Sequence, residues 1–120
     1  MLQGLRTIVY HVDDLETAKE WYQKIFEIEP YFDETYYVGY NVGGYELGLD
    51  PDGTAYNNGN HSITYWGIND IKKTFARFTE LGVAIHQEPN NVGGPIWVGS
   101  IFDPFGNVIG LIENPEFTHK

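Results

Sequence analysis

The sequence contains no cysteine and few basic residues. Without cysteine there are no disulfides, no thiolate metal sites and no cysteine nucleophiles. Lys and Arg total 7 against 17 Asp and Glu, so the formal net charge is −10. Binding of nucleic acid needs clustered cations to pair with phosphates, so no nucleic-acid partner is expected. The negative charge favours solubility and also permits attraction of a cationic ligand, and the composition leaves both interpretations open.

Long apolar runs are also missing. No segment approaches the roughly 20 apolar residues that are needed to span a bilayer, so no membrane partner is expected. The first residues, Met1–Arg6, show no charged segment followed by an apolar stretch, which favours a cytoplasmic location. A chain of 120 residues with 42% hydrophobic and 16% aromatic residues fits one domain with a packed core.

The first half of the chain predicts a strand, a helix and a hairpin. Asp13 and Glu16 are three residues apart, a variant of the capping box that opens a helix. That helix should end near Glu27, because Pro30 cannot continue it. The pair Gly43-Gly44 predicts a tight hairpin turn. The expected strands of this half are residues 5–12, 36–42 and 45–50.

The second half repeats this plan after a turn-rich linker at residues 51–60. Asn69-Asp70 opens a helix with apolar residues at helical spacing, and Gly82 is placed as its C-terminal cap. Asp103-Pro104-Phe105-Gly106-Asn107 predicts a turn before the last strand. The expected strands of this half are residues 61–68, 83–87, 96–102 and 108–113.

Two matched segments show that the halves are repeats. Val12-Asp13-Asp14-Leu15 corresponds to Ile68-Asn69-Asp70-Ile71, and Leu47-Gly48-Leu49 corresponds to Ile109-Gly110-Leu111. A duplicated unit that cannot bury its sheet alone pairs with its twin. The prediction is a single α+β domain over residues 1–120, with modules at about 4–50 and 61–114. The two paired βαβββ modules are expected to form a curved mixed sheet, a half-barrel around a cleft.

The order of these elements, with Asp103-Pro104-x-Gly106-Asn107 near the end, resembles the vicinal oxygen chelate superfamily of glyoxalase, bleomycin-resistance and dioxygenase proteins. The resemblance covers about residues 4–115, although typical members carry Asp where Phe105 stands here. It implies a cup formed by paired modules and, for members of this size, a homodimer. It also implies that many members hold a divalent metal with side chains from four strands.

The metal-ligand positions of the family fall on residues that are unsuited to bind a metal. By position they are Thr7, Ile63, Gly48 and Gly110, and none offers the imidazole or carboxylate that such metals need. No metal or other cofactor is therefore expected, and the two glycines are expected to open space at the floor of the cup. A displaced divalent-metal site formed by His11, His61 and Glu46 remains the alternative, because these residues share the cup-facing parity.

Alternation along the strands predicts which residues line the cup. The first half offers polar and acidic groups and the second an apolar wall, which suits an amphipathic small organic molecule. His11 could instead be a structural histidine, Glu46 and Asp50 could face solvent, and Tyr65 and Trp97 could belong to the core. The predicted ligand-binding residues are Thr7, His11, Glu46, Gly48, Asp50, Ile63, Tyr65, Trp97 and Gly110.

The leading hypothesis is a homodimeric protein that binds a small organic molecule in its cup without the usual metal. The alternative is a metal-dependent lyase, isomerase or dioxygenase of the same superfamily, or an enzyme that uses His11 and Glu46 as acid and base. A third possibility is a module that only dimerises. No nucleophile or phosphate-binding motif is present, so no catalytic residue is predicted.

Overall fold

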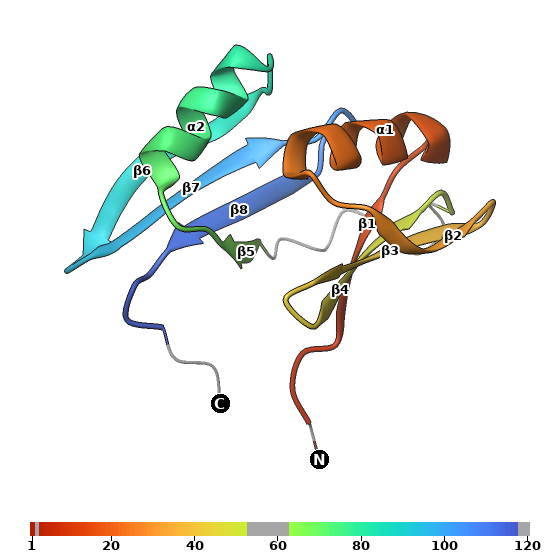
Figure 1. Ribbon diagram of the computed structural model, residues 1–120, viewed down its shortest axis with the longest axis horizontal. Helices are drawn as coiled ribbons and strands as arrows, with labels where there is room; N and C mark the ends of the chain where they lie inside the picture. The colour runs from red at the N-terminus through yellow and green to blue at the C-terminus, as the bar shows by residue number, and fades with distance from the viewer. Residues whose placement is uncertain (2, 53–62, 118–120) are drawn as a thin grey trace. The chain divides into compact units, whose positions relative to one another are not determined.

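The computed structural model describes residues 1, 3–52 and 63–117 and divides the chain into two units, Met1–Asn60 and His61–Lys120. We call them the N-terminal and C-terminal modules, and each has the order strand, helix and three strands (Figure 1). The N-terminal module contains β1 (Thr7–His11), α1 (Leu15–Phe26), β2 (Pro30–Glu34), β3 (Tyr37–Val42) and β4 (Tyr45–Asp50). The C-terminal module contains β5 (Thr64–Gly67), α2 (Ile71–Glu80), β6 (Ile85–Gly93), β7 (Ile96–Phe102) and β8 (Val108–Glu113).

The two modules share one sheet topology. The strand order is β1-β4-β3-β2 in the first and β5-β8-β7-β6 in the second. The first strand of each sheet runs parallel to the last, and the other neighbours are antiparallel. This repeat confirms the predicted α+β class and the βαβββ modules. Most of the expected linker, residues 53–60, lies outside the described residues.

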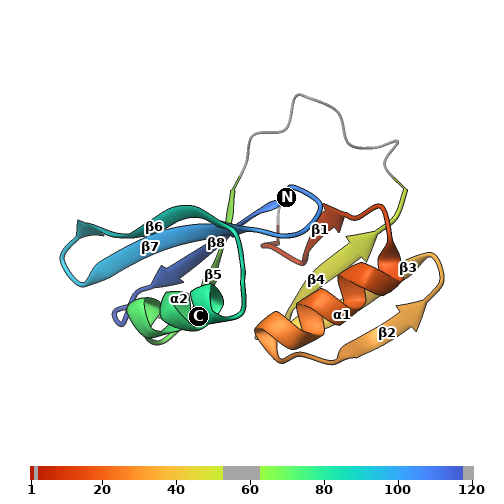
Figure 2. The same cartoon turned by 90° about the horizontal axis from the view of Figure 1, so that it is seen from above.

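Helix α1 covers one face of its sheet (Figure 2). Its buried residues Ala18, Tyr22 and Ile25 recur at helical spacing, and the Tyr22 ring lies 6.3 Å from that of Tyr10 on β1. The helix ends at Phe26 and Glu27 is its C-cap, which agrees with the predicted end near Glu27. Its N-cap is Asp14, which accepts a hydrogen bond from the Thr17 amide, so the prediction of Asp13 was wrong by one residue.

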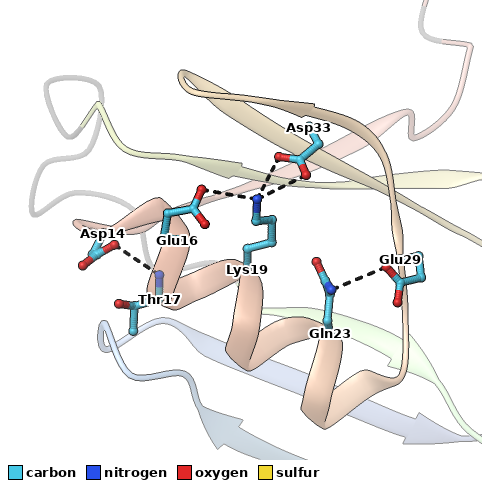
Figure 3. Close-up of polar contacts among 7 residues, drawn as sticks. All are labelled: Asp14, Glu16, Thr17, Lys19, Gln23, Glu29 and Asp33. Carbon is cyan, nitrogen blue, oxygen red and sulfur yellow. Dashed lines mark hydrogen bonds and ion pairs between the residues drawn. The ribbon is translucent and has the colours of Figure 1, made fainter.

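Polar contacts join α1 to edge strand β2 (Figure 3). Lys19 Nζ lies 3.1 Å from Asp33 Oδ1 and 3.3 Å from Glu16 Oε1, and Gln23 donates to Glu29. The sequence pattern predicts no strand at residues 30–34. Strand β2 begins at Pro30 itself, and proline is accepted there because an edge strand can leave one amide unpaired.

Helix α2 forms as the sequence predicts. Asp70 is its N-cap, Gly82 follows its C-terminus with a φ of 78°, and its apolar side is buried against β6, β7 and β8. Within the described residues, no helix is long and apolar enough to cross a membrane.

Strand β6 is longer than predicted. The sequence placed a loop after Gln87, whereas β6 continues to Gly93. Its register against β7 shifts between Gln87 and Asn90, which places Pro89 at an irregularity of an edge strand. A bulge on an edge strand tolerates a residue without an amide proton, so proline does not end this strand.

Both predicted turns are confirmed. Gly43 and Gly44 have φ angles of 60° and 92° and close the β3–β4 hairpin. In the β7–β8 turn, the carboxylate of Asp103 accepts hydrogen bonds from the amides of Phe105 and Asn107, each at 2.8 Å. Asp103 is only 4% exposed, so its carboxylate organises the turn from inside.

Candidate functional site

The sheet of the N-terminal module has two chemically different faces. The face against α1 is apolar and includes the buried side chains of Tyr10, Leu47 and Leu49. The opposite face, which we call the helix-free face, carries Thr7 and Glu46, which are cross-strand partners on β1 and β4. This face contains a carboxylate among hydroxyl groups, and it is the candidate site.

Three hydroxyl groups donate hydrogen bonds to the carboxylate of Glu46. Thr7 Oγ1 lies 2.6 Å from Glu46 Oε1, and the Tyr37 hydroxyl lies 2.7 Å from the same oxygen. The Tyr31 hydroxyl donates to Oε2. We call these four residues the Glu46 cluster. It joins β1, β2, β3 and β4, so one acidic side chain links all strands of the sheet.

Two glycines make room for the Glu46 cluster. Gly39 and Gly48 are cross-strand partners on β3 and β4. A Cβ atom on Gly48 would overlap the Tyr37 hydroxyl, and one on Gly39 would lie 2.8 Å from Glu46 Oε2 and 3.1 Å from Tyr31 Cε1. The space above Gly48 is therefore filled by Tyr37. The expectation that this glycine leaves open space is wrong, because tyrosine is long enough to cover a glycine on the neighbouring strand.

The cluster holds Glu46 in its charged form. Partial burial raises the pKa of Glu46, but the hydrogen bonds from Thr7, Tyr31 and Tyr37 outweigh burial and leave that pKa below its usual value. Burial, together with the bond to Glu46, raises the pKa of Tyr37 to about 12. The bond to Glu46 likewise raises the pKa of Tyr31. At neutral pH the site therefore contains an anionic carboxylate and protonated hydroxyl donors.

His11 and Asp50 lie at the other end of the same strands. They are cross-strand partners four residues beyond the pair Thr7 and Glu46, a separation of about 13 Å along the strands. His11 Nε2 lies 2.9 Å from an Asp13 carboxylate oxygen, and His11 Nδ1 lies 3.3 Å from the Asp50 carbonyl oxygen. The structure therefore gives His11 partners within the chain and does not bring it next to Glu46.

In the C-terminal module, a tyrosine again covers a glycine. A Cβ atom on Gly110 would lie 2.5 Å from Tyr65 Cδ1, so this glycine also leaves no open space. Tyr65 is 43% exposed and Ile63 is 40% exposed. Ser100 pairs with Gly110 from the other side and is buried, with its Oγ 2.7 Å from His86 Nδ1. This sheet therefore presents a tyrosine, an isoleucine and a serine–histidine contact, but no carboxylate cluster.

Trp97 lies on the other side of its sheet. Its ring is under Lys72 of α2, with Nζ 4.2 Å from the ring centroid. A cavity of about 260 Å³ adjoins it at the start of α2, where the Glu113 carboxylate accepts a hydrogen bond from the Ile71 amide. The placement of Trp97 beside Tyr65 and Gly110 was therefore wrong. Ile96, Trp97 and Val98 are all apolar, so alternation could not assign their faces.

The four positions where the family would hold its metal do not fit one. The Thr7 hydroxyl already donates to Glu46, Ile63 is aliphatic, and Gly48 and Gly110 lie under tyrosines. In the described part of the chain, no group of three or more His, Asp or Glu side chains is placed to bind a metal ion. The displaced site included His61, which lies outside the described residues.

The predicted ligand-binding residues do not include the aromatic residues that lie beside Glu46. Tyr31 and Tyr36 are each 64% exposed, and Phe32 is 36% exposed. The Phe32 ring centroid lies 6.0 Å from that of Tyr36 and 6.2 Å from that of Tyr37. We call these four residues the aromatic group. The crowding of tyrosines around the first hairpin was visible in the sequence, but their convergence on one carboxylate was not.

Comparison with known proteins identifies the family to which the chain belongs. No curated protein matches the sequence. Residues 4–111 match the Glyoxalase/Bleomycin resistance protein/Dioxygenase superfamily.

Solved structures of that superfamily have the same fold. A lactoylglutathione lyase from Agrobacterium tumefaciens is 18% identical with a TM-score of 0.78, over 97% of this chain and 98% of that one. A fosfomycin resistance protein from Listeria monocytogenes is 19% identical with a TM-score of 0.76, over 97% of each chain. A glyoxalase-related enzyme from Fulvimarina pelagi is 17% identical with a TM-score of 0.77, over 99% of this chain and 94% of that one. The protein therefore belongs to the Glyoxalase/Bleomycin resistance protein/Dioxygenase superfamily.

Proposed function

We propose that this protein binds a small organic molecule on the helix-free face of the N-terminal module, without a divalent metal. The observation that carries the proposal is the Glu46 carboxylate, which three hydroxyls hold in place beside exposed aromatic rings. A fixed polar group next to apolar surface is the usual composition of a small-molecule site, because the polar group orients the ligand and the apolar surface supplies affinity.

The absence of a metal is part of the proposal. In this chain, two of the four family positions are glycines and a third is isoleucine, so they supply no nitrogen or oxygen ligand. The carboxylate of Glu46, the cross-strand partner of Thr7, already accepts three hydrogen bonds. A metal would have to displace these donors and find its other ligands elsewhere, which disfavours metal binding at this site.

A thermal-shift screen tests the proposal. The full chain, stripped of metal with a chelator, is heated with 2-oxo acids, thiol adducts, cationic antibiotics and divalent metals. A ligand that binds only the folded state raises the melting temperature, and at 100 times its Kd it contributes about 2.7 kcal/mol. We expect at least one organic compound to raise the melting temperature without metal, and to do so less in Glu46→Gln. Stabilisation by metals alone would contradict the proposal.

A matched variant controls for charge. Glu88→Gln removes one negative charge from an exposed position on β6, outside the Glu46 cluster. Its response to the organic compound should equal that of the wild type, because Glu88 is not a member of the Glu46 cluster and salt screens the charge of an exposed residue. Equal losses in Glu46→Gln and Glu88→Gln would mean that the compound responds to net charge and not to this site.

The competing function is an enzyme. Two of the similar structures carry the names lactoylglutathione lyase and fosfomycin resistance protein. Acid–base catalysis by His11 and Glu46 predicts that His11→Ala and Glu46→Gln abolish turnover while the protein stays folded. A general acid and a general base must both come within hydrogen-bond reach of the reacting group. A separation of about 13 Å along the strands disfavours such a shared role.

A homodimer forms part of the same proposal, on the basis of the family resemblance. Light scattering of the purified chain is expected to give twice the mass of 13.7 kDa. A mass equal to one chain at micromolar concentration would contradict it.

A further inference from the structure

We infer that the ligand beside Glu46 is a soft organic cation, either a quaternary ammonium or a delocalised aromatic cation, without strong N–H donors. This inference rests on the proposed function and adds the chemical class of the ligand. It follows from three features of the N-terminal module: the sign of the charges on its strands, the hydrogen bonds already made by Glu46, and the aromatic group.

The strands of this module carry charge of one sign. Strands β1, β2, β3 and β4 contain no Lys or Arg, and their acidic residues are Asp33, Glu34, Glu46 and Asp50. On α1, Lys19 is paired with Asp33 and Glu16. An anionic ligand would find no cation on these strands, whereas a cationic ligand would be attracted to Glu46.

The hydrogen bonds of Glu46 select among cations. A carboxylate has two oxygens with about four acceptor sites in all, and Oε1 already accepts from Thr7 and Tyr37 while Oε2 accepts from Tyr31. A guanidinium needs both oxygens for its bidentate fork, and a primary ammonium has three donors to satisfy. Either would lose water without gaining enough acceptors. A cation without N–H groups gives up no hydrogen bonds to water, and it is still attracted by the negative charge of Glu46.

The aromatic group completes the site. The Tyr31 ring lies over Gly39, and its hydroxyl meets the same carboxylate that attracts the cation. Phe32 and Tyr36 add two exposed rings at the same end of the sheet. Aromatic faces stabilise quaternary ammonium groups by cation–π interaction, which adds to the attraction of a nearby carboxylate.

Calorimetric titration of the metal-stripped full chain with three matched probes tests the inference. Benzyltrimethylammonium is the soft cation, benzylammonium is the N–H-rich cation, and neopentylbenzene is the neutral molecule of the same shape. We expect about tenfold tighter binding of benzyltrimethylammonium than of either comparison probe, because the neutral probe lacks the cation–π and Coulomb attraction and benzylammonium must give up hydrogen bonds to water. The preference should fall in Glu46→Gln and remain in Glu88→Gln.

A second variant covers the case in which Glu46→Gln fails to fold. Tyr36→Leu removes an exposed ring from the aromatic group, and Tyr36→Phe keeps it. We expect several-fold weaker binding of benzyltrimethylammonium in Tyr36→Leu and unchanged binding in Tyr36→Phe. Equal affinity for all three probes, or tighter binding of benzylammonium, would overturn the inferred class while leaving metal-free binding intact. Binding of any organic compound only after metal is added would overturn the proposed function itself.

Discussion

The two modules have the same backbone plan and different chemistry on the sheet face opposite the helix. In each, a tyrosine covers a glycine of the last strand, Tyr37 over Gly48 and Tyr65 over Gly110. Tyr37 comes from β3 and directs its hydroxyl to Glu46, whereas Tyr65 comes from β5 and is 43% exposed. The repeated glycines therefore provide room for an aromatic ring, and the residue beside the ring decides what the face can bind.

The difference can be followed at matched positions. Gly39 in the N-terminal module corresponds to Ser100 in the C-terminal module, since they pair with Gly48 and Gly110. Ser100 contacts His86, whereas Gly39 leaves room for Tyr31 and Glu46. The buried Tyr40 likewise corresponds to Ile101. Substitutions at these positions should therefore affect the two modules differently.

Adding a side chain at Gly48 of the N-terminal module should have the largest effect on the unfolding free energy. In Gly48→Ala, the added methyl group would overlap the Tyr37 hydroxyl, so the ring must move and its bond to Glu46 must break. Overpacking of this kind costs about 1–3 kcal/mol, and the lost hydrogen bond places the expected value near the upper limit. Urea denaturation measures the change in unfolding free energy.

The matched control is Gly67→Ala. A Cβ atom at Gly67 would meet no atom within 4 Å, and its φ is not in the left-handed region. Its unfolding free energy should change by less than about 1 kcal/mol, because no atom is displaced and alanine restricts the unfolded chain. Equal losses at Gly48 and Gly67 would show that contact with Tyr37 does not determine the cost.

The β7–β8 and β3–β4 turns should differ in how much stability they lose when a side-chain acceptor is removed. Asp103→Ala leaves the amides of Phe105 and Asn107 without their buried acceptor, which should cost about 2 kcal/mol. In the β3–β4 turn, the Gly44 amide donates an exposed hydrogen bond to the Asn41 side chain, so Asn41→Ala should cost about 0.5 kcal/mol. Thermal unfolding of both variants checks this order, and a larger loss at Asn41 would contradict it.

The loss of unfolding free energy at acidic pH should depend on Glu46. Its folded pKa lies below the usual value of 4.5, so its contribution is present above that pH and is lost as the pH falls through the folded pKa. The site is partly exposed, so the contribution should be about 1 kcal/mol or less. Between pH 7 and pH 3, wild type should lose more unfolding free energy than Glu46→Gln. Identical losses in urea titrations at the two pH values would refute a lowered pKa.

The smallest expected effect concerns a buried hydroxyl. Tyr40 is fully buried, and its hydroxyl has no hydrogen-bond partner among the described residues. Tyr40→Phe removes this group and should leave stability unchanged or raise it by about 1 kcal/mol, because an unpaired buried polar group is unfavourable. Tyr37→Phe, which removes a paired hydroxyl, should instead lower stability. Chemical denaturation of both variants tests whether they change in opposite directions.

Much of the fold could be predicted from local patterns. Apolar spacing and Asp70 located α2, Gly43-Gly44 located the first hairpin, and the repeat predicted two equivalent modules. Strand β2 was missed because Pro30 was interpreted only as a helix terminator, although proline also suits the first residue of an edge strand. The end of β6 was missed because Pro89 lies at an irregularity that sequence alone does not reveal.

The candidate site was only partly predictable. The helix-free face of the N-terminal module and its member Glu46 follow from alternation along β4. The hairpin turn also implies that Gly39 faces Gly48, which could have indicated a space between the strands. The convergence of Tyr31 and Tyr37 on one carboxylate depends on side-chain conformations across three strands, and Tyr31 lies in the strand that was missed.

Native mass spectrometry of the full chain, before and after addition of benzyltrimethylammonium, shows whether an organic cation binds without a metal. The method reads a bound metal ion and a bound organic cation as separate increments of mass. We expect the purified chain to carry no stoichiometric metal and to gain the mass of the organic cation, and we expect this gain to be smaller in Glu46→Gln. A stoichiometric divalent metal that resists dialysis and is required for the organic cation to bind would refute metal-free binding.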